Sequence, residues 1–107
     1  MVSIATFKKI AMSFPDVVEQ PHFEKQSYRI GKKIFATLDI KNQLACLKLS
    51  VADQDIFSAF DKTIIYPVPN KWGQLGWTFV NLLLIKENML TEILKTAYDT
   101  MAPVKKK

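Results

Sequence analysis

The sequence predicts an α+β protein with a single antiparallel β-sheet, arranged as a meander, and helices packed on one face. The first and last segments repeat apolar residues at three- and four-residue spacing, which is typical of amphipathic helices. The middle of the chain alternates apolar and polar residues in short runs between turn sequences, as half-buried strands do. The length of 107 residues and the hydrophobic content of 49% suit one core. We therefore expect a single domain over residues 1–102, followed by a basic C-terminal tail over residues 103–107.

The first helix is expected from about Ser3 to Ser13. Serine is a preferred residue at a helix N-terminus, and Pro15 stops the helix because proline disfavours helical geometry in the residue before it. Residues 16–24 are expected to form a loop, with at most a short strand at residues 17–18. The apolar stripe of the helix consists of Ile4, Phe7, Ile10, Ala11 and Phe14.

Three strands are expected over residues 27–30, 33–39 and 43–49. Gly31 begins the turn between the first two, and glycine at this position favours a type II′ hairpin. Cys46 lies in the middle of the third strand, where a lone cysteine acts as a small apolar residue. Within the second strand, the alternation of side chains predicts one shared face made of Ile34, Ala36 and Leu38.

A helix over residues 51–60, a strand over residues 76–84 and a helix over residues 87–101 complete the expected fold. Ser50 can cap the first of these helices. Residues 61–75 are expected to be irregular, because the prolines in this segment cannot supply the N–H groups of a central strand. The last helix has an apolar stripe made of Leu90, Ile93, Leu94, Ala97 and Met101.

The net charge of +5 is concentrated at the C-terminus. Without Lys105–Lys107, twelve basic residues stand against ten acidic ones, and Arg29 is the only arginine. A mildly basic surface is compatible with nucleic-acid binding but does not require it. No apolar run is long enough to span a membrane, and the N-terminus lacks the charge order of a signal peptide. We expect a cytoplasmic protein with no membrane partner and leave its oligomeric state open.

Several short motifs follow one another in a characteristic order. From about residue 3 to residue 102, their order and spacing resemble the MmcQ/YjbR-like family. The resemblance implies a frataxin-like α+β fold whose two β-hairpins are likened to a double-wing DNA-binding motif, and members are commonly described as DNA-binding proteins. The motifs are Ser13–Asp16 (SFPD), Gln20–Phe23 (QPHF), Ser27–Ala36 (SYRIGKKIFA), Leu47–Leu49 (LKL), Gly76–Trp77 (GW) and Leu94–Tyr98 (LKTAY).

The first functional hypothesis is contact with DNA through basic hairpin wings. Lys32 is expected at the tip of the hairpin formed by residues 27–39, with Arg29 and Lys33 beside it, which suits phosphate contacts. The alternative is an ordinary solvated turn. Because there is a single arginine, we expect electrostatic contacts with weak sequence specificity. The full set of candidates is Arg29, Lys32, Lys33, Lys41, Lys48, Lys71 and Trp72.

The second hypothesis is a cleft for a small molecule or peptide near His22, Trp72 and Trp77. The tryptophans can stack on a flat ligand, and His22 can hydrogen-bond within a cleft. In the alternative, His22 pins its loop onto the sheet and Trp77 belongs to the core. Basic side chains that converge on one convex face would favour nucleic acid. A concave site around these three residues would favour a ligand.

The sequence contains no recognisable catalytic or metal-binding set. One histidine and one cysteine do not make a metal site, and the scattered acidic residues do not form the ridge that frataxin-like iron binding would need. Neither a Gly-x-Ser-x-Gly motif nor a glycine-rich phosphate loop is present. We therefore expect a non-enzymatic protein without cofactors, and an enzyme of unrecognised chemistry remains the third hypothesis.

Overall fold

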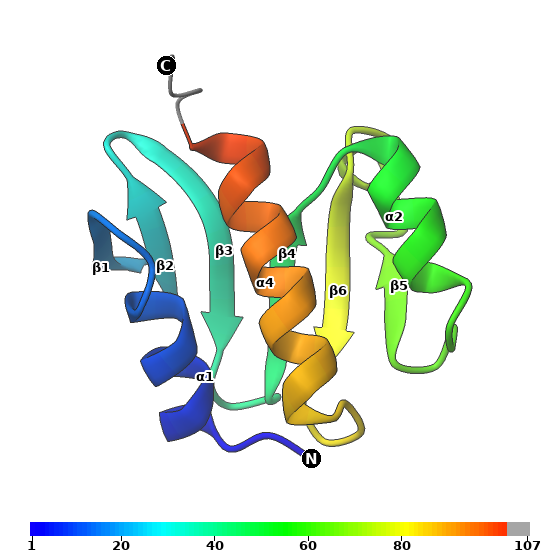
Figure 1. Ribbon diagram of the computed structural model, residues 1–107, viewed down its shortest axis with the longest axis horizontal. Helices are drawn as coiled ribbons and strands as arrows, with labels where there is room; N and C mark the ends of the chain where they lie inside the picture. The colour runs from blue at the N-terminus through cyan, green and yellow to red at the C-terminus, as the bar shows by residue number, and fades with distance from the viewer. Residues whose placement is uncertain (103–107) are drawn as a thin grey trace.

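A six-stranded antiparallel sheet in the order β1-β2-β3-β4-β6-β5 forms the frame of the protein (Figure 1). The structure is a computed structural model that describes residues 1–102. The predicted basic tail at residues 103–107 therefore lies outside the described residues. In chain order, the elements are α1 (Ile4–Met12), β1 (Val17–His22), β2 (Lys25–Ile30), β3 (Lys33–Asp39), β4 (Leu44–Lys48), α2 (Val51–Ser58), β5 (Ile65–Pro67), α3 (Lys71–Gln74), β6 (Trp77–Asn81) and α4 (Glu87–Met101).

Helices α1, α2 and α4 cover one face of this sheet, as the sequence predicts (Figure 1). Helix α4 runs across β3 and β4, α1 packs against β1 and α4, and α2 packs against β5. We call the opposite face of the sheet the open face, because α1, α2 and α4 all lie on the other side. Strands β2, β3 and β4 form the predicted three-stranded meander, β1 adds a strand beside β2, and β6 and β5 extend the sheet beyond β4.

The core lies between the helices and the sheet. Phe14, Phe35 and Tyr98 form an aromatic group there, with Phe14 stacked on Tyr98 at a centroid distance of 4.9 Å. The Tyr98 hydroxyl also donates a hydrogen bond to the Pro15 carbonyl at 2.7 Å, which ties α4 to the end of α1. The predicted stripes of these two helices account for their buried residues.

A β-bulge corrects the predicted faces of β3. The pairing register places Arg29 opposite Ile34 and Tyr28 opposite Ala36, so β3 has one extra residue, Phe35, at this point. An extra residue reverses the alternation of side chains beyond it. Phe35 is consequently buried on the helix side with Ala36, whereas Ile34 is only partly buried and lies on the open face.

Strand β1 is the main departure from the expected layout. Residues 17–22 form a six-residue edge strand paired with β2, where the sequence suggests a loop with two strand residues at most. Pro21 is compatible with this strand because an edge strand has a free side that needs no N–H donor. A side-chain bond from the Ser27 hydroxyl to the Gln20 carbonyl, 2.9 Å long, adds to the pairing.

Helix α2 is shorter than the expected helix over residues 51–60. It ends at Ser58, and its buried side chains are Gln54 and Ser58, while Ile56 and Phe60 are exposed. Within the segment expected to be irregular, β5 is a three-residue edge strand and α3 is a single helical turn. The proline rule therefore excludes a central strand there but not a short edge strand.

Candidate functional site: a hollow on the open face

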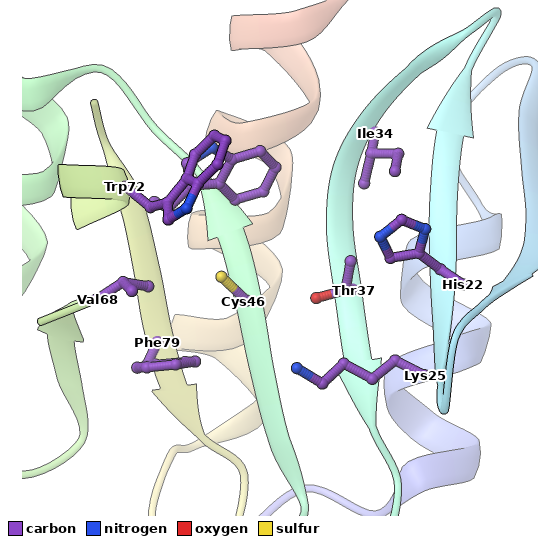
Figure 2. A pocket seen from close by; sticks show the side chains of 9 residues that line it. His22, Lys25, Ile34, Thr37, Cys46, Val68, Trp72 and Phe79 are labelled. Carbon is purple, nitrogen blue, oxygen red and sulfur yellow. The ribbon is translucent and has the colours of Figure 1, made fainter. Parts of the chain in front are cut away.

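The open face contains a hollow with a volume of about 430 Å³ (Figure 2). Its walls come from segments that are distant in the sequence: the β1–β2 hairpin, the middle of β3 and β4, the start of β6, and α3 with the residues before it. This volume lies within the range of about 300–1,000 Å³ that is usual for small-molecule sites. The lining residues are His22, Lys25, Ile34, Thr37, Cys46, Val68, Trp72, Trp77 and Phe79.

One end of the hollow is aromatic and apolar. Trp77 and Phe79 point outward from β6 because they alternate with the buried residues Thr78 and Val80. The prediction that Trp77 belongs to the core is therefore wrong. Trp77 is on a strand, as expected, but its side chain lies on the open face and is only half-buried. Trp72 projects from α3 at the same end and keeps 52% of its surface exposed.

Helix α3 is held in place by its own N-cap and by bonds from two other elements. The Asn70 side-chain oxygen caps it by accepting a hydrogen bond of 2.8 Å from the Trp72 backbone N–H. The Lys48 ammonium group, on β4, donates a hydrogen bond to the Leu75 carbonyl at the other end of the turn. The buried Gln54 amide, on α2, donates to the Gly73 and Trp77 carbonyls at 2.9 and 3.1 Å. These bonds fix the position from which Trp72 projects.

The glycines of this segment allow the chain to pass close to its neighbours. A Cβ atom at Gly73 would lie 1.9 Å from the Val68 carbonyl oxygen, and one at Gly76 would lie 1.8 Å from the Leu49 carbonyl oxygen. Gly76 also has φ +108°, a conformation that other residues rarely adopt. The two glycines therefore allow this segment to pack closely against Val68 and Leu49.

The other end of the hollow is polar and comes from the β1–β2 hairpin. His22 and Lys25 are paired at the end of this hairpin, and both side chains point into the hollow (Figure 2). Lys25 forms no ion pair among residues 1–102. Both oxygens of Asp39, the nearby carboxylate on the same face, accept hydrogen bonds from Asn42, which lower the Asp39 pKa; the Lys25 charge lowers it further.

The turn of this hairpin has an unusual residue. Phe23 has φ +60° and is 93% exposed, with its ring edge-to-face against the His22 ring at 4.8 Å. A non-glycine residue in the left-handed region is strained by about 1–2 kcal/mol. Phe23 is thus both strained in its backbone and exposed in its side chain, and it lies at the hairpin tip beside the polar end of the hollow.

Thr37 and Cys46 lie side by side on the floor between the two ends (Figure 2). Burial raises the pKa of the Cys46 thiol to about 11, although the Lys25 charge acts in the opposite direction. The thiol is thus neutral near pH 7 and adds a weakly polar surface to the floor.

The predicted basic candidates do not gather on one face. The register of β2 and β3 places Arg29 on the open face, where its Nε donates to the Ser27 hydroxyl at 3.0 Å. Lys33 pairs with the buried Ile30 and therefore points to the helix side, while Lys32 occupies the tip. Lys41 lies at the opposite end of β3, about 20 Å away along seven residues of strand. Lys48 bonds to Leu75, and Lys71 is exposed on α3 beside Trp72.

The strand residues of the open face nevertheless carry more positive than negative charge. By strand register, the open face has three cationic side chains, Lys25, Arg29 and Lys48, and one carboxylate, Asp39. The helical side carries both signs: the acidic residues Glu19, Asp53, Asp55, Glu87, Glu92 and Asp99, and the basic residues Lys8, Lys9, Lys33 and Lys95. The field over the open face therefore favours a negatively charged partner.

The comparison with protein families matches residues 12–100 to YjbR. The chain belongs to the YjbR family. This membership confirms the resemblance drawn from the sequence motifs. No helix within residues 1–102 of this YjbR-family protein has the length and apolar character needed to cross a membrane. In the same part of the chain, no group of three His, Cys, Asp or Glu residues is arranged to hold a metal ion.

A solved structure agrees with the fold of this YjbR-family chain. The crystal structure of the Deinococcus radiodurans protein DR2400, with a DUF419 domain, matches it with a TM-score of 0.75 at 20% sequence identity. The match covers 92% of this chain and 77% of the other, and it confirms the α+β fold class. The search of curated proteins finds no match.

The structure brings the three residues of the predicted cleft together around one hollow. It also places there further lining residues that sequence reasoning missed. His22, Trp72 and Trp77 all line the hollow. Lys25, Thr37 and Phe79 also line it but were not predicted. The alternation of β6 could have revealed Phe79, since it lies two residues from Trp77. No local sequence pattern identifies Lys25 as a lining residue, because its position beside the hollow depends on the pairing of β1 with β2.

Proposed function

We propose that this YjbR-family protein is a non-enzymatic binding protein that holds a small ligand in the open-face hollow. The observation that carries the proposal is the meeting of His22, Trp72 and Trp77 around one hollow of about 430 Å³. His22 comes from a hairpin that is separated by about half of the chain from the helical turn and the strand that carry Trp72 and Trp77. A protein that binds a small ligand requires such a concave site, whereas a protein that contacts DNA through a convex wing does not.

The chemistry of the lining supports binding rather than catalysis. The titratable side chains in the hollow are His22, Lys25 and Cys46. The Cys46 thiol is a poor nucleophile near neutral pH because burial raises its pKa to about 11. His22 has an aromatic neighbour, Phe23, and the side-chain hydrogen bonds within residues 1–102 give it no carboxylate to orient it as a base.

The test is a titration with small planar compounds, followed by two-dimensional NMR of the ¹⁵N-labelled protein. The expected result is movement of the two indole N–H signals and of the Cys46 amide signal, with little change in the amides of α4. The Trp72→Ala variant should lose most of the affinity while keeping its fold. Signal changes confined to the helical side, or unchanged affinity in Trp72→Ala, would overturn the proposal.

A second candidate function is electrostatic binding to DNA through the β2–β3 hairpin. The placement of Arg29, Lys32 and Lys33 on one hairpin beside the cationic open face favours it. With about three to five phosphate contacts, log affinity should fall with log salt with a slope of roughly −3 to −4. Fluorescence anisotropy of labelled duplex DNA at about 50 and about 200 mM salt measures this slope. Unchanged affinity in a Lys32→Glu, Lys33→Glu double variant would exclude this hairpin as the contact.

A further inference from the structure

From the two unlike ends of the hollow, we infer that its ligand is a planar aromatic ring that carries an anionic group. This inference rests on the proposed function and names the class of ligand. The ring lies at the tryptophan end of the hollow, and the anionic group lies beside Lys25. Free small molecules such as nucleotides have this chemistry, and so does an unstacked base with its phosphate in single-stranded nucleic acid.

The ring is assigned to one end by the aromatic surfaces that meet there. Trp72 and Phe79 present ring surface to the hollow, with Val68 beside them (Figure 2). Trp77, two residues before Phe79 on β6, lines the hollow as well. Trp72 keeps 52% of its surface exposed, although indole burial is favourable, so a ring is left available for stacking. A flat ligand gains both apolar burial and ring–ring contact at this position.

The anionic group is assigned to the other end by the state of Lys25. Lys25 is exposed, forms no ion pair among residues 1–102, and extends its ammonium group over the floor toward Thr37 and Cys46 (Figure 2). Asp39, the carboxylate on this face, is already bonded twice to Asn42. The ammonium group of Lys25 is therefore the free cation within the lining, and His22 beside it can donate a second hydrogen bond.

The distribution of charge supports the same assignment. The open face carries Lys25, Arg29 and Lys48 against one carboxylate, so a neutral ring would leave this excess uncompensated. A cationic ligand would be repelled by the same side chains. An anion without a ring would leave the exposed aromatic surface at the far end in contact with water.

The experiment compares matched pairs of compounds that differ in charge but hardly in ring size. The pairs are adenosine monophosphate with adenosine, and indole-3-acetate with indole-3-acetamide; inorganic phosphate serves as an anion without a ring. Affinities come from NMR shifts of the indole N–H signals, which also report on compounds that absorb in the ultraviolet. We expect at least one anionic member to bind about tenfold more tightly than its neutral partner, as a charge-assisted hydrogen bond would produce.

Three variants locate the origin of this preference. Lys25→Gln should abolish the preference by weakening the anionic member more than its neutral partner, whereas Lys32→Gln, at the tip of the other hairpin, should preserve it. Trp72→Ala should weaken both members of a pair. A second measurement needs no variant: added salt should weaken the anionic member and not the neutral one.

The outcomes separate this inference from the proposed function. Equal binding of both members in each pair, at any salt concentration, would overturn the inference and leave the hollow as a binding site. If no ring compound moves the indole signals, the proposed function fails as well. A short single-stranded oligonucleotide distinguishes the sources of the ligand: binding that requires both Lys25 and Trp72 supports a nucleic-acid source. Oligonucleotide binding that is lost only in the Lys32→Glu, Lys33→Glu variant would overturn the inference in favour of the hairpin.

Discussion

Gln54→Ala is expected to lower both the stability of the protein and the affinity of the hollow. Gln54 is 95% removed from solvent on α2, and its amide nitrogen reaches the Gly73 carbonyl, the Trp77 carbonyl and the Thr78 hydroxyl at 2.9, 3.1 and 3.2 Å. One amide nitrogen has two hydrogens, so the three acceptors share two bonds. These bonds join α2 to the segment that carries both tryptophans.

The size of the effect follows from these bonds and from their acceptors. Two neutral hydrogen bonds contribute about 1 kcal/mol each to the free energy of unfolding, and the loss of buried side-chain carbon adds about 0.8 kcal/mol. The Gly73 and Trp77 carbonyls are not left unpaired, because each also accepts a backbone bond of 3.0 Å, from Gly76 and Val68 respectively. We therefore expect a loss of about 2–3 kcal/mol, which corresponds to a fall in Tm of roughly 10–20 °C for a domain of this size.

Urea unfolding followed by tryptophan fluorescence and by far-ultraviolet circular dichroism measures this loss. The matched control is Gln74→Ala, since Gln74 is an exposed glutamine on α3; its effect should stay below about 0.5 kcal/mol. Gln54→Leu, which keeps the volume without the bonds, should fall between the two. If Gln54→Ala unfolds within about 0.5 kcal/mol of Gln74→Ala, the bonds do not hold α3 in place and the account of the Trp72 position is wrong.

Three further predictions test the turns, the glycines and the floor of the hollow. Phe23→Gly should raise the free energy of unfolding by up to about 1 kcal/mol, because it removes the strain of φ +60° and a side chain that is 93% exposed; a lower Tm would show that the Phe23 ring stabilises the hairpin. Gly76→Ala should cost more than about 3 kcal/mol, because its Cβ would overlap the Leu49 carbonyl oxygen. Gly31→Ala, with φ +61° but open space around it, should cost only about 1–2 kcal/mol; similar Tm values for the two variants would contradict the close approach at Gly76. Cys46 should react with iodoacetamide at pH 8 about a hundredfold more slowly than a free cysteine, because a pKa of about 11 leaves about one thiolate in a thousand, and its rate should rise about tenfold per pH unit up to that pKa. A mass-spectrometric time course measures this rate, and a reaction as fast as that of free cysteine would place the thiol outside a buried floor.

The order and type of most elements could be predicted from the sequence, because the signals that define them are local. The stripes of α1 and α4 repeat within three or four residues, and Gly31 shows φ +61° in the turn where a type II′ hairpin is predicted. The motifs that point to the YjbR family have the same local character. They correctly indicate an α+β protein with one antiparallel sheet covered by helices on one face.

The faces of the strands were less predictable, because a single extra residue reverses them. The bulge at Phe35 moves Ile34 from the expected core face to the open face. Strand β1 has no strong alternation of its own, and its six residues are ordered by pairing with β2. In both cases the deciding contacts lie in another strand.

The sequence by itself determined the helices α1, α2 and α4, the meander and three of the residues that line the hollow, since periodicity, capping and turn residues act over a few positions. It could not determine that His22, Lys25, Trp72 and Trp77 surround one hollow, or that Lys33 points to the helix side and Lys41 lies at the far end of β3. Those facts depend on the strand register and on bonds such as that between Lys48 and Leu75, which join residues 27 positions apart. Only the packed tertiary structure brings such distant groups together, because burial and pairing, rather than local conformational preference, decide which face each side chain occupies.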